Sequence, residues 1–497
     1  MEALKELVKV LNRKCLSKID VLDKTLLHQT KENLYYRLYE GLENGKITDD
    51  ASAAKYLYGS TEKDAKYRKL KSRFRSKLMR TVLLFDNEDV FVNSQSQAYY
   101  ECLTNNHIIE VLLKLTGTSK LVYELVQDSL PKAKQFKFYD ILKNYSFYML
   151  SYYSVKGDQK SFNKEQEKYL SYLDLSGKEQ YAKFLFYKSS IKLDNQSPIT
   201  DDLLKEVELI LLEMTQLRKL LESYEIDFFY FFLALEYYQK SNKLDSIISI
   251  CDEAEYIMTE NTLTYTNTRK IIILFFRLNT YLSLKKFEEA IKLIKTEKAL
   301  QIPVNYYNWF LLKETEFKLY LHNNNVKDSY RVYEEVIDNN SFKNQVDRMT
   351  EKWKIYHAYL VFLDNYLNNG DYKKFSLPKF LNSVPVNSKD KSGFNFAIRI
   401  IELLFQFARG EDAMVFHKMD ALRVYRSRYL NDNTYKRNHL FLSLLLKSEK
   451  SGFDYKVLHK ADWQEIQNLR DRKHIIAEWE IIPYEELWDI FVELAKR

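Results

Sequence analysis

The sequence predicts an all-α protein, most of it an α-solenoid in which antiparallel helix hairpins stack on one another. Helix interiors exclude Gly and Pro, and the 497 residues include only 10 Gly and 6 Pro, about 3% of the chain against an average of about 12%. No Gly occurs between positions 178 and 369. A β-rich chain would need turn residues at intervals of roughly 8–12 residues. The chain also exceeds one ordinary core, so several domains or an open-ended array are expected.

Four tyrosines mark the predicted repeat, and each lies six residues before an apolar residue. The pairs are Tyr238 and Leu244, Tyr281 and Phe287, Tyr320 and Val326, and Tyr366 and Tyr372. The tyrosines recur at intervals of 43, 39 and 46 residues, and a short polar stretch fills most of each gap. Such a period is typical of hairpins that bury their apolar faces only against their neighbours. Because repeat arrays mostly bind other molecules, the pattern favours binding over catalysis.

The N-terminal region, residues 1–130, should hold helices at about 2–13 and 23–43, a short helix at 52–58, and further amphipathic helices within 95–130. Between them lies a longer helix over 61–85, with Thr61 as its expected N-cap and acidic residues in its first turn. A short helix, the turn at Gly59 and Ser60, and a longer basic helix follow one another as in a helix-turn-helix, which we therefore predict over 50–85.

The net charge of the chain is concentrated in this segment. The whole chain carries 76 Lys and Arg against 69 Asp and Glu, a net charge of +7. Residues 61–80 contain nine basic and two acidic residues, which also sum to +7, so the other 477 residues are neutral overall. On a helix, one stripe should face a core, formed by Tyr67, Leu70, Phe74, Leu78, Thr81 and Phe85.

The cations of the basic helix lie on the remaining faces: Lys66, Arg68, Lys69, Arg73, Arg75, Lys77 and Arg80. They could contact the phosphates of a nucleic acid. An acidic protein partner would use the same face, and a solvated basic helix is a third interpretation. The sequence leaves these three alternatives open.

Helices are expected to alternate with short polar breaks from Pro131, taken as a boundary, to residue 375, which gives room for about six hairpins. The stretch 376–393, with two prolines, is the predicted loop before a C-terminal helical block at 394–497. The last helix should begin at Pro483, with acidic residues in its first turn, and cap the array.

The spacing from Tyr281 through Phe287 to Ala290 resembles the tetratricopeptide repeat (TPR). In that family a tyrosine near the end of one helix is followed by an apolar residue and then by a small residue where the two helices cross. The resemblance implies a right-handed superhelix with a concave groove for a peptide or protein segment. It assigns no peptide-binding residue here, because the other units match less well at the small position, with Ile247, Ser329 and Phe375.

No motif of catalysis or metal binding occurs in the sequence. The eight His are scattered, the three Cys (Cys15, Cys102 and Cys251) lie far apart, and phosphate-binding glycine motifs are missing. We therefore expect no enzyme activity, no cofactor and no metal.

The most apolar stretch, residues 228–235, is far shorter than the roughly 18 residues of a membrane span, so the sequence predicts no membrane association and a cytoplasmic location.

These observations predict a non-enzymatic scaffold or adaptor, active in protein–protein interaction, that binds a protein or peptide partner. The alternative is a regulator in which the basic helix contacts nucleic acid while the repeats sense a protein or peptide. An accessory subunit that docks its basic helix on an acidic protein face is a third possibility. The partner and the oligomeric state do not follow from the sequence.

Overall fold

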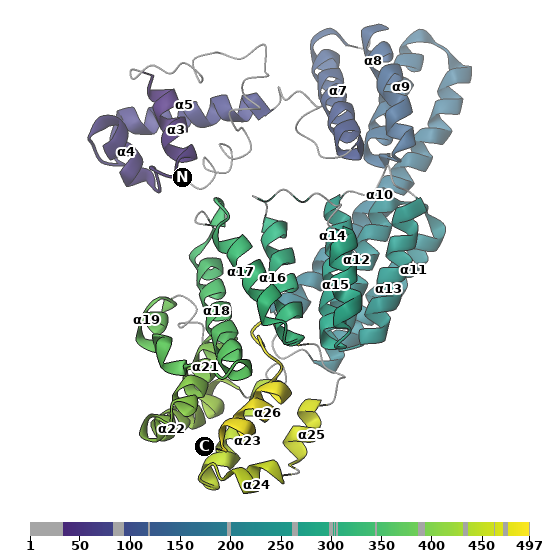
Figure 1. Cartoon of the computed structure of the whole chain (residues 1–497). Coiled ribbons are helices and arrows are strands. Elements are labelled where there is room, and N and C mark those ends of the chain that lie inside the picture. Colours follow the sequence, from purple (N-terminus) through teal and green to yellow (C-terminus); the bar gives the residue numbers. More distant parts are fainter. Residues whose placement is uncertain are drawn as a thin grey trace. The chain divides into compact units, whose positions relative to one another are not determined.

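The described part of the chain is mostly helical. A computed structural model describes residues 33–82, 94–117, 120–195, 200–260, 267–297, 302, 304, 307–342, 345–385, 393–430, 436–461, 463–470 and 476–496. Over these ranges the chain forms helices and turns and no strand (Figure 1), which confirms the all-α prediction. The predicted helix at 2–13 and the first part of the one at 23–43 lie outside the described residues.

The chain divides into two compact units. The first comprises Met1–Gly177 and Leu263–Thr266, and the second Lys178–Thr262 and Asn267–Arg497. The division therefore differs from the predicted boundary at Pro131, which lies inside helix α8 (Lys120–Gln135). Proline removes one helical hydrogen bond there, but the buried residues Val126 and Ala133 on either side keep the helix packed and continuous.

The first unit contains two small cores. Helices α3 (Leu34–Glu43), α4 (Asp50–Tyr58) and α5 (Ala65–Val82) surround one core. Helices α7 (Ser94–Thr116), α8 and α9 (Tyr139–Lys156) surround the other. Helix α10 (Gln159–Asn195) follows and continues into the second unit.

Local capping explains where α4 and α5 begin and end. Asp49 and Ser52 form a capping box at the start of α4, and Gly59, in the left-handed conformation with φ of 63°, ends it. Helix α5 begins at Ala65 and not at the predicted Thr61. The physical reason is Asp64, whose carboxylate accepts the backbone N–H of Lys66 at 2.7 Å and so satisfies a free donor of the first turn.

The second unit begins with helices that pack in chain order. They are α11 (Asp201–Leu220), α12 (Tyr224–Lys240), α13 (Leu244–Glu260), α14 (Asn267–Ser283), α15 (Phe287–Glu297), α16 (Tyr307–His322), α17 (Val326–Ile337) and α18 (Asp347–Leu367). Each contacts the next, and α12 also contacts α14, as α14 contacts α16. The first helices of successive pairs therefore lie next to one another.

Three turns between these helices have the same geometry. The residue four positions after the marker tyrosine is left-handed at Asn242, Lys285 and Asn324, with φ of 61°, 56° and 54°. The next backbone N–H then donates to the tyrosine carbonyl, at 2.9 Å in all three turns. This is the Schellman arrangement that ends a helix. In the turn after Tyr366 the pattern shifts by one residue, because Gly370 donates to Asn365.

The C-terminal block completes the second unit. It contains the 3₁₀ turn η4 (Tyr372–Lys374), α19 (Leu377–Asn382), α21 (Phe394–Ala408), α22 (Asp412–Tyr429), α23 (Lys436–Lys450), α24 (Tyr455–His459), α25 (Gln464–Arg470) and α26 (Tyr484–Leu494). The predicted loop 376–393 thus includes a short helix, α19, which begins next to a proline and buries Leu377 and Phe380. The start of α26 directly after Pro483 agrees with the predicted last helix.

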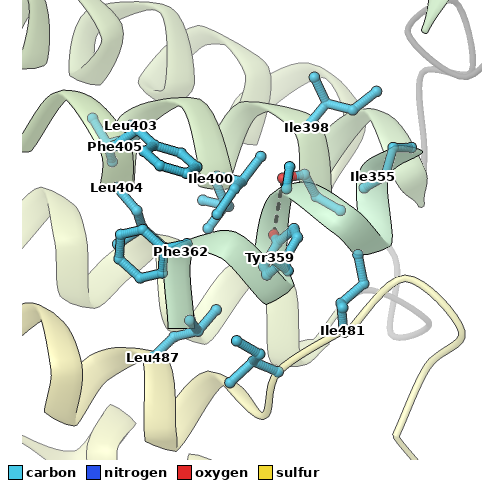
Figure 2. Close-up of a cluster of buried hydrophobic side chains, with 14 of the residues drawn as sticks. Ile355, Tyr359, Phe362, Ile398, Ile400, Leu403, Leu404, Phe405, Ile481 and Leu487 are labelled. Carbon is cyan, nitrogen blue, oxygen red and sulfur yellow. Dashed lines mark hydrogen bonds between the residues drawn. The ribbon is translucent and has the colours of Figure 1, made fainter. Parts of the chain in front are cut away.

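The largest described core joins α18, α21 and α26 (Figure 2). Phe362 of α18 and Leu403 of α21 are fully buried in it, and the Tyr359 hydroxyl donates to the Ala397 carbonyl at 2.9 Å. Ile481, from the chain that leads into α26, lies beside Tyr359 in the same core. A residue outside the helices is therefore part of the packing of the second unit.

Candidate functional site

The basic helix α5 packs with one side against α3 and α4. Tyr67, Leu70, Phe74 and Leu78 are buried against α3 and α4, whereas Thr81 and Phe85 lie outside the residues whose side chains are described. Five predicted contact residues are exposed, and we call them the basic face: Lys66, Arg68, Lys69, Arg73 and Arg75. Lys77 is half-buried with its ammonium 4.9 Å from the Tyr35 ring, and the side chain of Arg80 is not among those described.

One cation of α5, Lys71, stabilises the packing of α5 on α4. Lys71 pairs with Asp50 of α4 at 2.6 Å, and the hydroxyl of Tyr67 donates to the same carboxylate at 2.5 Å. Burial would raise the pKa of Asp50, but these two hydrogen bonds lower it below its usual value. The basic face, by contrast, forms no ion pair with any residue that the structure describes. Its charges are therefore separate from the contacts that hold α5 in place.

The predicted repeat-packing residues lie at successive helix turns and not in one pocket. Each apolar member is the first residue of its helix or turn, at Leu244, Phe287, Val326 and Tyr372. Leu244, Ala290, Tyr320 and Tyr372 are buried, and Tyr238, Tyr281, Phe287, Val326 and Tyr366 are half-buried. These side chains lie where one helix ends and the next begins.

A second candidate site is the face of α14, α16 and α18 that carries a non-helical stretch of the chain. We call this stretch, Ile476–Ile482, the C-terminal segment; it includes a turn in which Glu480 N–H donates to the Ala477 carbonyl at 3.0 Å. In Figure 1 the chain before α26 passes beside α16. Because of these contacts and its neighbouring helices, α16 is buried at every position from Leu312 to His322.

Side chains of the helices hold the backbone of the C-terminal segment. The Lys318 ammonium donates to the carbonyl of Glu478 at 2.8 Å, and the Ile476 N–H donates to the Ser283 hydroxyl at 3.1 Å. His322 Nε2 lies 2.8 Å from the carbonyl of Ile481. A carbonyl only accepts, so this nitrogen carries the proton. Backbone groups of a non-helical segment are thus satisfied by three separate helix side chains.

A buried ionic cluster lies beneath the segment. Glu314 accepts from the Tyr356 hydroxyl at 2.6 Å and pairs with Lys352 at 2.6 Å and with Lys318 at 3.4 Å. Burial would raise the pKa of Glu314, but Lys352 and Lys318 lower it, so the carboxylate is ionised. Lys352 also reaches the half-exposed carboxylate of Glu478 at 2.6 Å. The face therefore offers a cation to an acidic side chain of whatever segment lies on it.

The second half of the segment is anchored more deeply. Glu480 is fully buried and meets the guanidinium of Arg437 through two parallel contacts of 2.6 and 2.9 Å. Trp479 packs over Gly393, where a Cβ would come within 2.9 Å of the ring and where φ is 67°. Only glycine satisfies both requirements. The first half, from Ile476 to Trp479, is half-buried or exposed, so the two halves differ in how firmly they are held.

In the described part of the chain, Cys102 and Cys251 are both buried. No group of three or more His, Cys, Asp or Glu among the described residues could hold a metal ion. Burial raises the pKa of the Cys102 thiol to about 11 and that of Cys251 to about 12, which keeps both protonated. Cys15 lies outside the described residues.

The C-terminal segment was not predicted from the sequence. The alternation of apolar and acidic residues from Ile476 to Ile482, without a helix period, was the available signal. Its partners lie far away in sequence, as with Lys318 and Glu478, 160 residues apart. Charged residues along α16 were a further signal, because a helix with buried Lys and Glu must find their partners elsewhere.

Comparison of the chain with protein-family models, with curated proteins and with solved structures gives no match. Within the described ranges, no helix has the length and apolar character needed to cross a membrane.

Proposed function

We propose that this chain is a non-enzymatic helical-repeat protein that binds a non-helical segment of a partner protein on the face of α14, α16 and α18. One observation carries the proposal: Ser283, Lys318 and His322, from two of these helices, hold the backbone of the chain's own segment. Contacts to backbone groups do not depend on side-chain identity. The same surface can therefore accept another polypeptide.

The pattern of contacts between the helices supports a repeat architecture. The first helices of successive pairs touch, from α12 to α14 and from α14 to α16, and three of the intervening turns share one backbone geometry. Both features are expected of stacked hairpins related to the TPR. In such an array the shared face of the first helices is a natural place for an elongated ligand.

The partner segment should replace Ile476–Trp479, the less buried half of the C-terminal segment. Glu480 and Ile481 are fully buried and hold α26 in place, so they should remain bound when the partner segment replaces the first half. The cation at Lys352 favours an acidic residue at the position now filled by Glu478. We therefore propose a partner segment that carries an acidic residue next to apolar ones.

A charge-swap experiment on the full chain tests this function. The probe is a fluorescein-labelled peptide with the sequence of residues 472–479, which ends before the buried Glu480. Glu478→Lys in the protein weakens the internal segment and leaves the helix face intact, so the peptide should bind about five-fold tighter than to wild type, the equivalent of about 1 kcal/mol for a half-exposed pair.

A variant of the helix face provides the control. Glu314→Leu/Lys352→Met removes the cation without leaving a buried charge unpaired, so it should weaken binding of this peptide, whereas a peptide with Met in place of Glu478 should bind that variant at least as well. The proposed face would be ruled out if a scrambled peptide bound equally well, or if both folded variants bound the peptide with the affinity of the wild type.

A further inference from the structure

The exposed side of α5 has a layout that the fold does not require. At about 100° per residue, Lys66, Lys69 and Arg73 form one row and Arg68 and Arg75 form a second row on the opposite flank. Between the rows lie small exposed residues at Ala65, Ser72 and Ser76, with Met79 at the end of the stripe. No acidic residue occurs anywhere in α5.

The underside of α5 is fixed, so this layout is a property of a positioned helix. Phe74 and Leu78 are fully buried in the α3–α5 core. Lys71 and Tyr67 both hold Asp50 of α4, and Arg37 of α3 donates to the Tyr56 carbonyl at 2.7 Å. The two rows therefore keep their spacing without a ligand.

The basic face opposes the stability of the helix that bears it. Lys69 and Arg73, at positions i and i+4, are like charges on adjacent turns, which is unfavourable in a helix. No described residue neutralises either of them by an ion pair. A polyanionic ligand would remove this repulsion.

We propose that α5 binds duplex DNA in the major groove, with one row of cations toward the phosphates of each strand. A helix about 10–12 Å across fits a groove about 12 Å wide. The small residues between the rows let the helix axis approach the floor of the groove. The deep, narrow major groove of A-form RNA does not admit a helix. A flat acidic protein surface would meet one row at a time, because the two rows lie on opposite flanks of the helix.

The contacts are mainly to phosphates. Ala65, Ser72 and Ser76, in the centre of the face, offer little to base edges, and no Asn or Gln lies on α5. Binding should therefore depend weakly on sequence and strongly on salt. This inference concerns a different surface from the one that binds polypeptide in the proposed function, and it does not rest on that function.

Fluorescence anisotropy of the full chain with a random duplex DNA of about 20 base pairs, two helical turns, tests the proposal. Five phosphate contacts predict a log–log salt slope of about −4.5, a weakening of several hundredfold between about 50 and 200 mM salt. Duplex RNA, single-stranded DNA and polyglutamate serve as the competing ligands and should bind at least about ten-fold more weakly at the lower salt.

Two variants, each lacking one row of cations, distinguish binding in the DNA groove from contact through one side of α5. Lys66→Gln/Lys69→Gln/Arg73→Gln should reduce the slope by about 2.7, and Arg68→Gln/Arg75→Gln by about 1.8. Lys160→Gln/Lys164→Gln on exposed positions of α10 makes the same charge change as the second variant and should leave the slope unchanged. Circular dichroism should show both row variants folded, because these side chains lie outside the core.

Three results would overturn the proposal. They are no binding of duplex DNA at the lower salt, equal binding of polyglutamate or RNA, and dependence on one row alone. The last two would assign the basic face to an acidic protein or to RNA.

Discussion

At the scale of single residues, the turns of the second unit show how backbone conformation ends the helices. Asn242, Lys285 and Asn324 adopt the left-handed conformation that ends a helix. Residues with a Cβ, other than Asn and Asp, pay a steric penalty there. Lys285 is the exception, and its ammonium meets the carboxylates of Glu485 at 3.2 Å and Glu486 at 2.9 Å. Its charge thus compensates for an unfavourable backbone.

Asn324→Ala should lower the free energy of unfolding by about 1 kcal/mol, because alanine disfavours the left-handed conformation. Asn324→Gly should cause no loss, since glycine adopts φ of 54° freely. Lys327→Ala, an exposed position in α17, is the matched control and should change stability by less than about 0.5 kcal/mol. Urea denaturation measures all three, and an unaffected Asn324→Ala would show that this turn is not strained.

His322 should make stability depend on pH between about 3 and 6.5. Burial, together with Lys318, lowers its pKa from 6.5 to about 3. The unfolded chain therefore binds a proton in this range that the folded chain excludes, so the stabilising effect is complete above pH 6.5 and is lost as the pH falls. At pH 5 the wild type should have lost about 2 kcal/mol through this group relative to pH 7.

His322→Gln keeps a donor for the Ile481 carbonyl and removes the titration. Denaturation at pH 7, 6 and 5 should show a smaller decrease in stability for the variant. His357 and His439, whose pKa values burial also lowers, are present in both proteins. The difference between them therefore reports His322, and parallel pH profiles would contradict the prediction.

At the scale of elements, α16 is held by charges as well as by apolar contacts. Its Phe317 ring packs on Trp353 and Tyr356 of α18, while Glu314 of the same helix meets Lys352. Buried ions are costly unless paired. The ionic cluster therefore fixes which residues of α16 and α18 face one another, and the C-terminal segment shares it through Glu478.

Lys352→Met should destabilise the second unit by about 3–5 kcal/mol, because it leaves the buried Glu314 short of a partner. Glu314→Leu/Lys352→Met should recover most of that loss, since no uncompensated charge remains. Lys447→Met, which breaks the more exposed pair with Glu465, should cost at most about 1 kcal/mol. Calorimetry of the four proteins completes the comparison. A double variant as unstable as the single one would mean that packing, not charge, dominates.

At the scale of the whole molecule, the chain has two compact units with separate cores. The basic face belongs to the first unit and the α14–α18 face to the second. If both proposals hold, one chain combines DNA binding with recognition of a polypeptide segment, which is the arrangement of a regulator. Each activity can then be removed by substitutions in its own unit.

The two units should unfold in distinct calorimetric transitions. Phe74→Ala removes a fully buried ring from the first unit and Phe362→Ala one from the second. Each should lower its own transition, by about 3–5 kcal/mol of unfolding free energy, and leave the other unchanged. A single transition shifted by both substitutions would show that the units unfold together.

Much of the local structure could be predicted from the sequence. The scarcity of Gly and Pro indicated helices, the stripe from Tyr67 to Leu78 indicated the buried side of α5, and Pro483 indicated the start of α26. These features depend on residues within a few turns of one another. The start of α5 was misjudged because Thr61 and Asp64 both suit a helix start, and only the hydrogen bond to Lys66 distinguishes them.

The site on the second unit could not be predicted in this way. Charged residues such as Glu314, Lys318 and Lys352 usually face solvent in a helix, yet all three are buried. Lys318 and Lys352 contact Glu478, which lies more than 120 residues from each of them. The sequence by itself therefore determined the helices, their turns and the charge of α5, because these follow from local conformational preference and spacing. Only the tertiary structure decided where the C-terminal segment lies, because that depends on pairing buried charges from distant parts of the chain.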